Sequence, residues 1–186
     1  TKSAVISPDY SEAAKFSDIW LAPKAGTDSA LAMAMDDQMT PDISVEHLGV
    51  TTFCCLLPKT HPLAERESVS FEDLLGQTVI SYRAPTRPRE ELDQAARKKG
   101  LVFSAQLEIE VSISAVGFVQ AGLGVAVVDD LLPWKQFEGV TTRPLQDSPD
   151  LPLSLLSLAG KTLSRAEEGM RDEIRKLCAS RLPARP

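Results

Sequence analysis

The sequence lacks a long apolar run, a surplus of positive charge and a signal for secretion. No apolar stretch approaches the roughly 20 residues of a membrane-spanning helix, and Thr1-Lys2-Ser3 begins without an initiator Met or a signal-peptide core. The 186 residues carry a formal net charge of -6 at pH 7, which is unsuited to binding phosphate backbones. We therefore expect an excised or fused piece of a soluble protein that binds neither membranes nor nucleic acid directly.

Cysteine is scarce as well. The chain has Cys54, Cys55 and Cys178. Consecutive side chains of a strand point to opposite faces, so the adjacent pair is unsuited to an ordinary disulfide. The pattern predicts no disulfide framework and is typical of a reducing compartment, so we expect a cytoplasmic protein.

Known catalytic motifs are also missing. The sequence contains no Gly-x-Ser-x-Gly, His-Glu-x-x-His, Walker loop or Cys-x-x-Cys, and His47 and His61 are too few for a metal cluster or a triad. Gly122-Leu123-Gly124 lacks the third glycine of a dinucleotide fingerprint and precedes a strand pattern, so we interpret it as a helix end. We predict no enzyme activity, no catalytic residue, no cofactor and no metal.

The composition that remains is that of a globular protein, with 43% hydrophobic and 25% charged residues. Short β-type runs alternate with helical patterns along the chain, which is typical of an α/β fold with a largely parallel sheet. The expected strands are Ala4–Ser7, Asp18–Leu21, Val50–Leu57, Thr78–Tyr82, Phe103–Val111, Val125–Val128, Val140–Arg143 and Leu153–Leu158.

Capping signals predict helices between these runs. Ser70 precedes Asp73 by three residues, which is typical of a helix N-cap followed by an acid, and a second helix is expected over 88–99. Ser164 and Glu167 form a capping box for a last amphipathic helix. The apolar side of this helix carries Met170, Ile174, Leu177 and Cys178.

Polar side chains stand where several predicted strands end. In open α/β sheets, small ligands bind beyond the carboxyl ends of the strands, beside helix N-termini with free N–H groups. Each serine before a helix has an equally good interpretation as an ordinary N-cap. The candidate ligand-binding residues are Ser81 and Tyr82 after one strand, Ser112 and Ser114 between a strand and a helix, and Asp129 after another strand.

The types of these side chains predict the chemistry of the ligand. The serine hydroxyls are suited to a carboxylate and Asp129 to a cationic group, which favours an amino-acid-like effector over a simple dicarboxylate. Three arginines follow Tyr82 and are suited to clamping a carboxylate, although an arginine on a loop is more often solvated. They are Arg83, Arg87 and Arg89.

Three motifs carry a family resemblance over about residues 47–186. They are Cys55–Ala64, Ser70–Gly76 leading into the strand Thr78–Ser81, and Phe118–Asp129. In this order and spacing they resemble the effector-binding domain of LysR-type transcriptional regulators. The Val-Val-Asp ending of the third motif is most similar to the subgroup that senses opines and basic amino acids.

The resemblance implies an α/β, two-lobed, type 2 periplasmic-binding-protein-like fold with Rossmann-like lobes. Lobe I would comprise residues 1–57 and 154–186, and lobe II residues 58–153. A small polar metabolite would bind between the lobes. Transcriptional control would need a DNA-binding domain, which this sequence does not contain. The resemblance leaves open whether the chain forms a homodimer.

Residues 1–39 fit that family poorly and resemble the molybdopterin-guanine-dinucleotide-binding region of the nitrate reductase catalytic subunit. The matching segments are Val5–Tyr10, Ala14–Lys24 and Gly26–Met35. The resemblance implies a turn that opens a helix at Asp28. It also implies a dinucleotide site at Pro8, Asp9, Gly26, Thr27 and Asp28.

A chimera is the simplest account of two resemblances in one chain. In this hypothesis a structurally similar fragment of a molybdenum enzyme replaces the first half of lobe I. The sequence leaves open whether such a fusion is natural or engineered. Effector binding is the leading function. The alternatives are a molybdopterin oxidoreductase fragment that binds the dinucleotide, and an engineered structural scaffold that binds no ligand.

Overall fold

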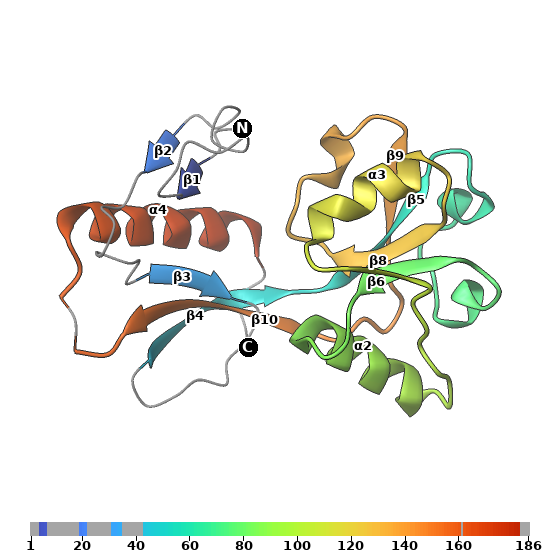
Figure 1. The fold of residues 1–186 in the computed structure, drawn as a ribbon, viewed down its shortest axis with the longest axis horizontal. Helices are drawn as coiled ribbons and strands as arrows, with labels where there is room; N and C mark the ends of the chain where they lie inside the picture. Colours follow the sequence, from blue (N-terminus) through green and yellow to red (C-terminus); the bar gives the residue numbers. More distant parts are fainter. Residues whose placement is uncertain (1–3, 7–18, 22–30, 35–42, 161, 183–186) are drawn as a thin grey trace.

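The computed structural model describes residues 4–6, 19–21, 31–34, 43–160 and 162–182, and Figure 1 shows that they form two lobes. Lobe I contains β1 (Ala4–Ile6), β2 (Ile19–Leu21), β3 (Leu31–Ala34), β4 (Ile43–Thr51), β10 (Leu151–Leu158) and α4 (Arg165–Arg181). Lobe II contains β5 (Phe53–Pro58), β6 (Val79–Tyr82), α2 (Arg87–Lys98), β7 (Leu107–Ile109), α3 (Ala115–Gln120), β8 (Val125–Asp129) and β9 (Val140–Pro144). Its short 3-10 turns are η1 (Pro62–Glu65), η2 (Glu72–Leu74), η3 (Ser112–Ser114) and η4 (Trp134–Gln136).

Lobe I contains two small sheets. β1 and β2 pair in parallel, in agreement with the two strands expected there, and β10 lies between β3 and β4, antiparallel to both. The predicted helix beginning at Asp28 is wrong where the structure describes it, because residues 31–34 form β3. Pairing with β10 supplies this segment with backbone hydrogen bonds, and such tertiary pairing overrides the weak preference of the residues for a helix.

Lobe II has one five-stranded sheet in the order β7-β6-β8-β5-β9. β6 is parallel to β7 and β8, but β5 is antiparallel to both of its neighbours. The sheet is therefore mixed, whereas the sequence predicted largely parallel pairing. The two lobes share one arrangement. In lobe I, β10 arrives from lobe II and lies antiparallel between two strands, and in lobe II, β5 arrives from lobe I and does the same.

The chain crosses between the two large sheets twice. Thr52 joins β4 to β5, and residues 145–150 join β9 to β10. The strand pairing of residues 53–57 places them in the sheet of lobe II, although the predicted lobe boundary assigned them to lobe I. The boundaries of the two lobes stay a prediction. The strand pairing favours boundaries at these two crossings.

Each face of the lobe II sheet has its own core. Cys55, Leu57 and Val127 point to one face, which α2 covers, while Cys54, Leu56 and Val128 point to the other, which α3 covers (Figure 1). The adjacent cysteines therefore lie in different clusters, as the alternation of a strand requires. Fully buried strands covered on both faces explain why their sequences are almost continuously apolar.

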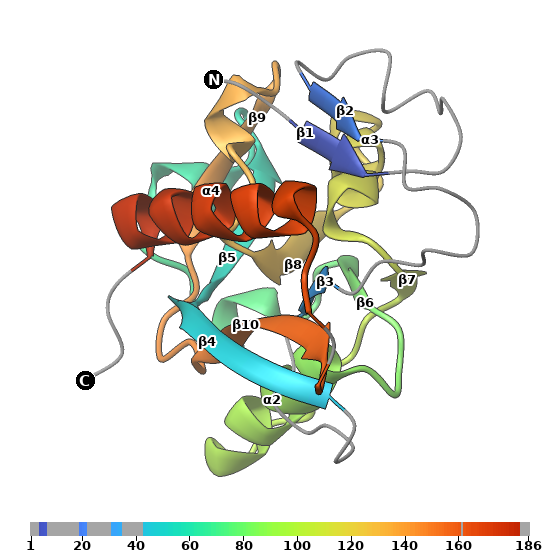
Figure 2. The ribbon, with the colours of Figure 1, turned by 90° about the vertical axis from the view of Figure 1, so that its left-hand side faces the viewer.

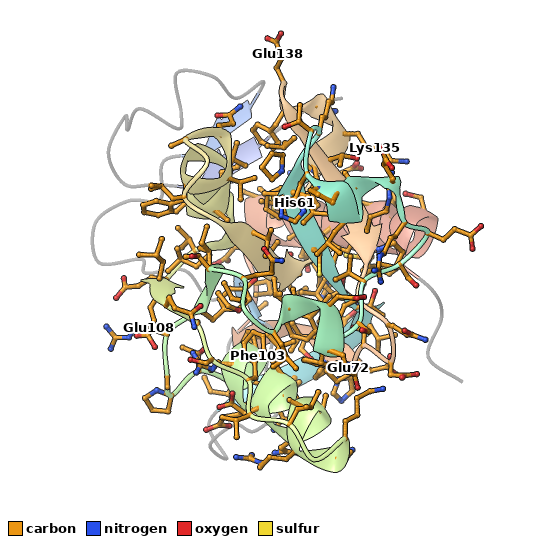
Figure 3. The ribbon with its side chains drawn as sticks, turned by 90° about the vertical axis from the view of Figure 1, so that its right-hand side faces the viewer. His61, Glu72, Phe103, Glu108, Lys135 and Glu138 are labelled. Carbon is orange, nitrogen blue, oxygen red and sulfur yellow. The ribbon has the colours of Figure 1, made fainter. Side chains whose placement is uncertain are left out.

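The strand predicted over Phe103–Val111 is shorter than expected. Only Leu107–Ile109 pair with β6, whereas Phe103 packs edge-on against Phe71 at 6.0 Å between ring centroids, beside α2 (Figure 3). Val102 next to it is 82% exposed. The apolar run thus consists of a loop anchored in the core by Phe103, followed by a short edge strand. The periodicity of the sequence does not distinguish such a loop from a strand.

The glycine pair behaves as predicted. α3 ends at Gln120, Gly122 has a φ of 72°, and β8 begins at Val125. A Cβ atom on Gly124 would lie 2.2 Å from the carbonyl oxygen of Thr78, so only glycine fits this approach to the start of β6.

The last helix, α4, lies along lobe I and contacts β4 (Figure 2). Ser164 and Glu167 form the predicted capping box at its start. Met170 and Ile174 are partly buried and Cys178 is buried, but Leu177 is 51% exposed, so its predicted place on the packed face is wrong. The packed face follows a four-residue spacing that excludes position 177. None of the described helices has both the length and the hydropathy needed to cross a bilayer.

Candidate functional site

The structure brings Tyr82 and Asp129 together at the carboxyl ends of two neighbouring strands. Tyr82 ends β6 and Asp129 ends β8, which runs parallel to β6. The Tyr82 hydroxyl donates a hydrogen bond to Oδ2 of Asp129. The same hydroxyl oxygen accepts a hydrogen bond from the Asp129 backbone N–H at 3.1 Å. Two candidates that are distant in sequence therefore form one hydrogen-bonded pair.

Asp129 is enclosed within lobe II. The residue is 1% exposed, and its Oδ1 accepts a hydrogen bond from the Leu131 N–H at 3.1 Å. Its carbonyl oxygen accepts from the Trp134 indole N–H at 2.9 Å. Both carboxylate oxygens thus have partners inside the lobe, and in this structure neither is presented to a ligand.

Ser81 is buried in the sheet. Its side chain donates to the carbonyl oxygen of Val127 at 2.8 Å, and the residue has no exposed surface. This bond ties β6 to β8 beside the Tyr82 and Asp129 pair, one residue before Tyr82 and two residues before Asp129. We therefore infer that Ser81 and Asp129 support the predicted site from inside lobe II. Ligand contact by the five candidate residues stays a prediction.

The Tyr82 hydroxyl remains a proton donor. Burial raises its pKa most, and the charge and side-chain hydrogen bond of Asp129 raise it further. The hydrogen bonds from the Asp129 backbone N–H and the Ser112 side chain lower it. Ser112 begins η3 and is half-buried, and Ser114, which leads into α3, is exposed. Of the five candidates, these two serines carry the polar groups that reach toward solvent.

The three arginines after Tyr82 have partners of their own. Arg83 pairs with Glu110 at 3.0 Å, and Arg87 pairs with Glu91 at 2.8 Å. Arg89 pairs with Asp93, donates to the Tyr82 carbonyl oxygen at 3.1 Å and stacks over Phe103. These pairs lie on α2 and at the edge of the sheet, and an arginine clamp for a carboxylate would have to share a guanidinium with one of them.

The second predicted set lies outside the described residues. It comprises Pro8, Asp9, Gly26, Thr27 and Asp28.

A cavity that the sequence did not indicate is lined by Cys54, Asp130 and Trp134, which lie close to Asp129. It has a volume of about 850 Å³, and Lys135, labelled in Figure 3, borders it. Burial raises the pKa of the Cys54 thiol and of the Asp130 carboxyl, both of which line the cavity. Arg143 also lines it, but its guanidinium is held by the backbone oxygens of Arg66, Ala64 and Thr142.

Comparison with known families decides the assignment. The profile of the LysR substrate binding domain matches residues 28–179. The chain belongs to the LysR substrate-binding domain family. The match begins before residue 47, where the sequence resemblance was placed, and it therefore includes β3.

Individual regulators match over shorter segments. An uncharacterized HTH-type transcriptional regulator, YybE of Bacillus subtilis, is 33% identical over 75 residues, which is 40% of this chain and 26% of that protein. A probable RuBisCO transcriptional regulator of Cyanophora paradoxa is 27% identical over 132 residues, 64% of this chain and 39% of that protein. The chain thus spans well under half the length of these curated relatives.

Solved structures of LysR effector-binding domains share the fold. The effector-binding domain of QuiR in complex with shikimate has a TM-score of 0.69 at 18% identity, covering 92% of this chain and 87% of that one. The BenM effector-binding domain with benzoate has a TM-score of 0.64 at 20% identity, covering 87% and 79%. The two-lobed, periplasmic-binding-protein-like fold is thereby confirmed.

The second resemblance is confirmed for a short segment. The respiratory nitrate reductase 2 alpha chain of Escherichia coli is 74% identical over 35 residues, which is 19% of this chain but 3% of that protein. This combination of matches is consistent with a chimera.

Proposed function

We propose that this chain is the effector-sensing part of a LysR-type transcriptional regulator and binds a small carboxylate beside Ser112 and Ser114. The observation that carries the proposal is the hydrogen bond between the Ser112 side chain and Tyr82, at the paired ends of β6 and β8, with Ser114 in the same turn as Ser112. Those ends point toward lobe I in Figure 1, and the Asp130 N–H donates to the Thr52 carbonyl oxygen at 2.9 Å, at the crossing between the lobes.

The burial of Asp129 leads us to prefer a different ligand class from the one that the sequence favoured. The amino-acid-like effector rested on Asp129 as the partner of a cationic group, but the Asp129 carboxylate is occupied by Tyr82 and Leu131. The hydroxyls of Ser112 and Ser114 remain as donors of the proposed site, and hydroxyl donors suit the carboxylate of a ligand. Shikimate and benzoate, the ligands named for QuiR and BenM, are both carboxylates, which supports this preference.

Calorimetry with shikimate, benzoate and arginine tests the proposal. A carboxylate should bind and raise the melting temperature by mass action, and arginine should bind no better. Preferential binding of arginine would restore the amino-acid-like effector. Stabilisation by molybdopterin guanine dinucleotide would favour the enzyme-fragment alternative, and no binding by any of these compounds would favour a scaffold without ligand binding.

The remaining expectations stay predictions. The family supports a regulatory rather than an enzymatic role and a cytoplasmic location. With its negative net charge, the chain alone should not retard DNA in a gel, since its own groups would repel phosphates. A homodimer is tested by sedimentation at several protein concentrations.

A further inference from the structure

Asp129 is a junction of four structural elements in lobe II. Its side chain binds Tyr82 at the end of β6, and its carbonyl oxygen accepts from Trp134 in η4 and from the Cys54 thiol of β5. The residue itself ends β8 and is 1% exposed. A group with so many buried hydrogen bonds fixes the relative positions of the elements that supply them.

The same junction is joined to both crossings between the lobes. In the pairing of β5 with β8, Phe53 lies opposite Asp129, directly after the crossing residue Thr52. The Phe53 N–H donates to the Ser148 hydroxyl of the second crossing at 2.7 Å, and the Leu145 N–H donates to the Phe53 carbonyl oxygen at 3.1 Å. Displacement of Asp129 therefore acts on the backbone of both connections through Phe53.

We propose that Tyr82 and Asp129 are positioning residues that couple the ligand end of lobe II to the two crossings at Thr52 and Ser148. This inference rests on the proposed function for the location of the ligand, but the coupling itself is a property of the free protein. A ligand that shifts Ser112 also acts on the Tyr82 hydroxyl, and the Asp129 junction passes the shift to Phe53. Asp129 thereby contributes to sensing without contact with the ligand.

A double-mutant cycle measures this coupling without any ligand. Tyr82→Phe removes the hydroxyl that binds Asp129, and Ser148→Ala removes the acceptor of the Phe53 N–H. The two side chains belong to different hydrogen bonds. If the sites are independent, the change in the unfolding equilibrium constant of the double variant equals the product of the changes in the two single variants. Coupling should appear as a departure of about threefold or more from this product. Additive effects would overturn the inference.

Gln106→Ala is the matched control. Gln106 accepts a hydrogen bond from the Val79 N–H at 2.7 Å, so this variant loosens the opposite end of the same strand, β6. Its cycle with Ser148→Ala should be additive. Equal coupling in both cycles would mean that any loosening of β6 reaches the crossing, and the specific role of Tyr82 and Asp129 would be refuted.

Hydrogen exchange with benzoate as the probe gives the second readout. If benzoate binds, exchange of the Phe53 amide should slow about tenfold in the wild-type chain at saturating benzoate. Tyr82→Phe, compared at its own saturating benzoate concentration, should lose most of this protection. Benzoate protection of Phe53 that survives Tyr82→Phe contradicts the inference. Absence of benzoate binding in the wild-type chain counts against the proposed carboxylate ligand alone, because the ligand-free cycle still decides the coupling.

Discussion

Arg175 of α4 forms a two-pronged ion pair with Glu46 of β4, with Nε to Oε1 at 2.5 Å and Nη2 to Oε2 at 2.8 Å. The pair joins the last helix to a strand 129 residues earlier in the chain. Both side chains remain partly exposed, so the pair orients α4 more than it stabilises the fold. The packing of its neighbour Ile174 should therefore carry most of the helix docking.

Ile174→Asp is expected to destabilise the protein by about 2–4 kcal/mol, because it places an unpaired charge in the partly buried face of α4. Leu177→Asp is the matched control, since Leu177 is 51% exposed, and it should change the stability by less than about 0.5 kcal/mol. Urea unfolding followed by circular dichroism compares them. Equal effects of the two substitutions would show that α4 docks through a different face.

Gly124→Ala is expected to destabilise lobe II by about 3 kcal/mol or more, because the added Cβ meets the Thr78 carbonyl oxygen at 2.2 Å and the backbone must move. Gly117→Ala adds the same methyl group inside α3, where nothing lies within 4 Å, and should stabilise the protein by about 0.5–1 kcal/mol. Thermal melts of the two variants should shift in opposite directions. A Gly124→Ala protein that melts like the wild type contradicts the described approach of β8 to Thr78.

Asp73 should contribute to stability in a pH-dependent way. The Ser70 backbone N–H, at 3.0 Å, is the main cause that lowers the pKa of Asp73 below its ordinary 3.8, and the Ser70 hydroxyl and Arg66 lower it further. Because the folded pKa is the lower one, the stabilisation is fully present above pH 3.8 and is lost as the pH falls through the folded value. Asp73→Asn should therefore reduce stability by about 1 kcal/mol at pH 7.

The loss caused by Asp73→Asn should shrink as the pH falls below 3.8, because the wild-type carboxylate takes up a proton as the pH falls through its lowered pKa. Urea unfolding at pH 7, 4 and 2 measures the difference. Glu72→Gln, which removes the charge of an exposed neighbour in the same turn, serves as the control. A difference between Asp73→Asn and wild type that is constant with pH would rule out the proposed ionic capping.

Ser114→Ala should weaken binding of benzoate or shikimate roughly ten- to a hundredfold, because a hydrogen bond to a charged ligand group is worth about 1.5–3 kcal/mol. The residue is exposed and its side chain makes no capping hydrogen bond with α3, so the melting temperature should stay unchanged. Ser104→Ala, an exposed serine near Gln106, is the control. Calorimetry that finds the affinity within about twofold of wild type would remove Ser114 from the site.

Local signals in the sequence were sufficient for several elements. The Ser164 and Glu167 box starts α4, Ser70 and Asp73 exchange hydrogen bonds as a capping pair, and Gly122 ends the α3 segment. Each of these features depends on residues a few positions apart, whose chemistry allows few backbone conformations. Three short motifs in register were likewise enough to indicate the family.

Only the tertiary structure decided the rest. Residues 31–34 form a strand because β10 pairs with them from the far end of the chain, and β5 reverses the sheet because it enters from the other lobe. The sequence placed Asp129 at the ligand end of a strand, but it could not reveal that Tyr82, 47 residues away, occupies its carboxylate. Whether a charged side chain meets solvent or an internal donor depends on which strands become neighbours, and pairing between distant segments leaves no signal in the local pattern.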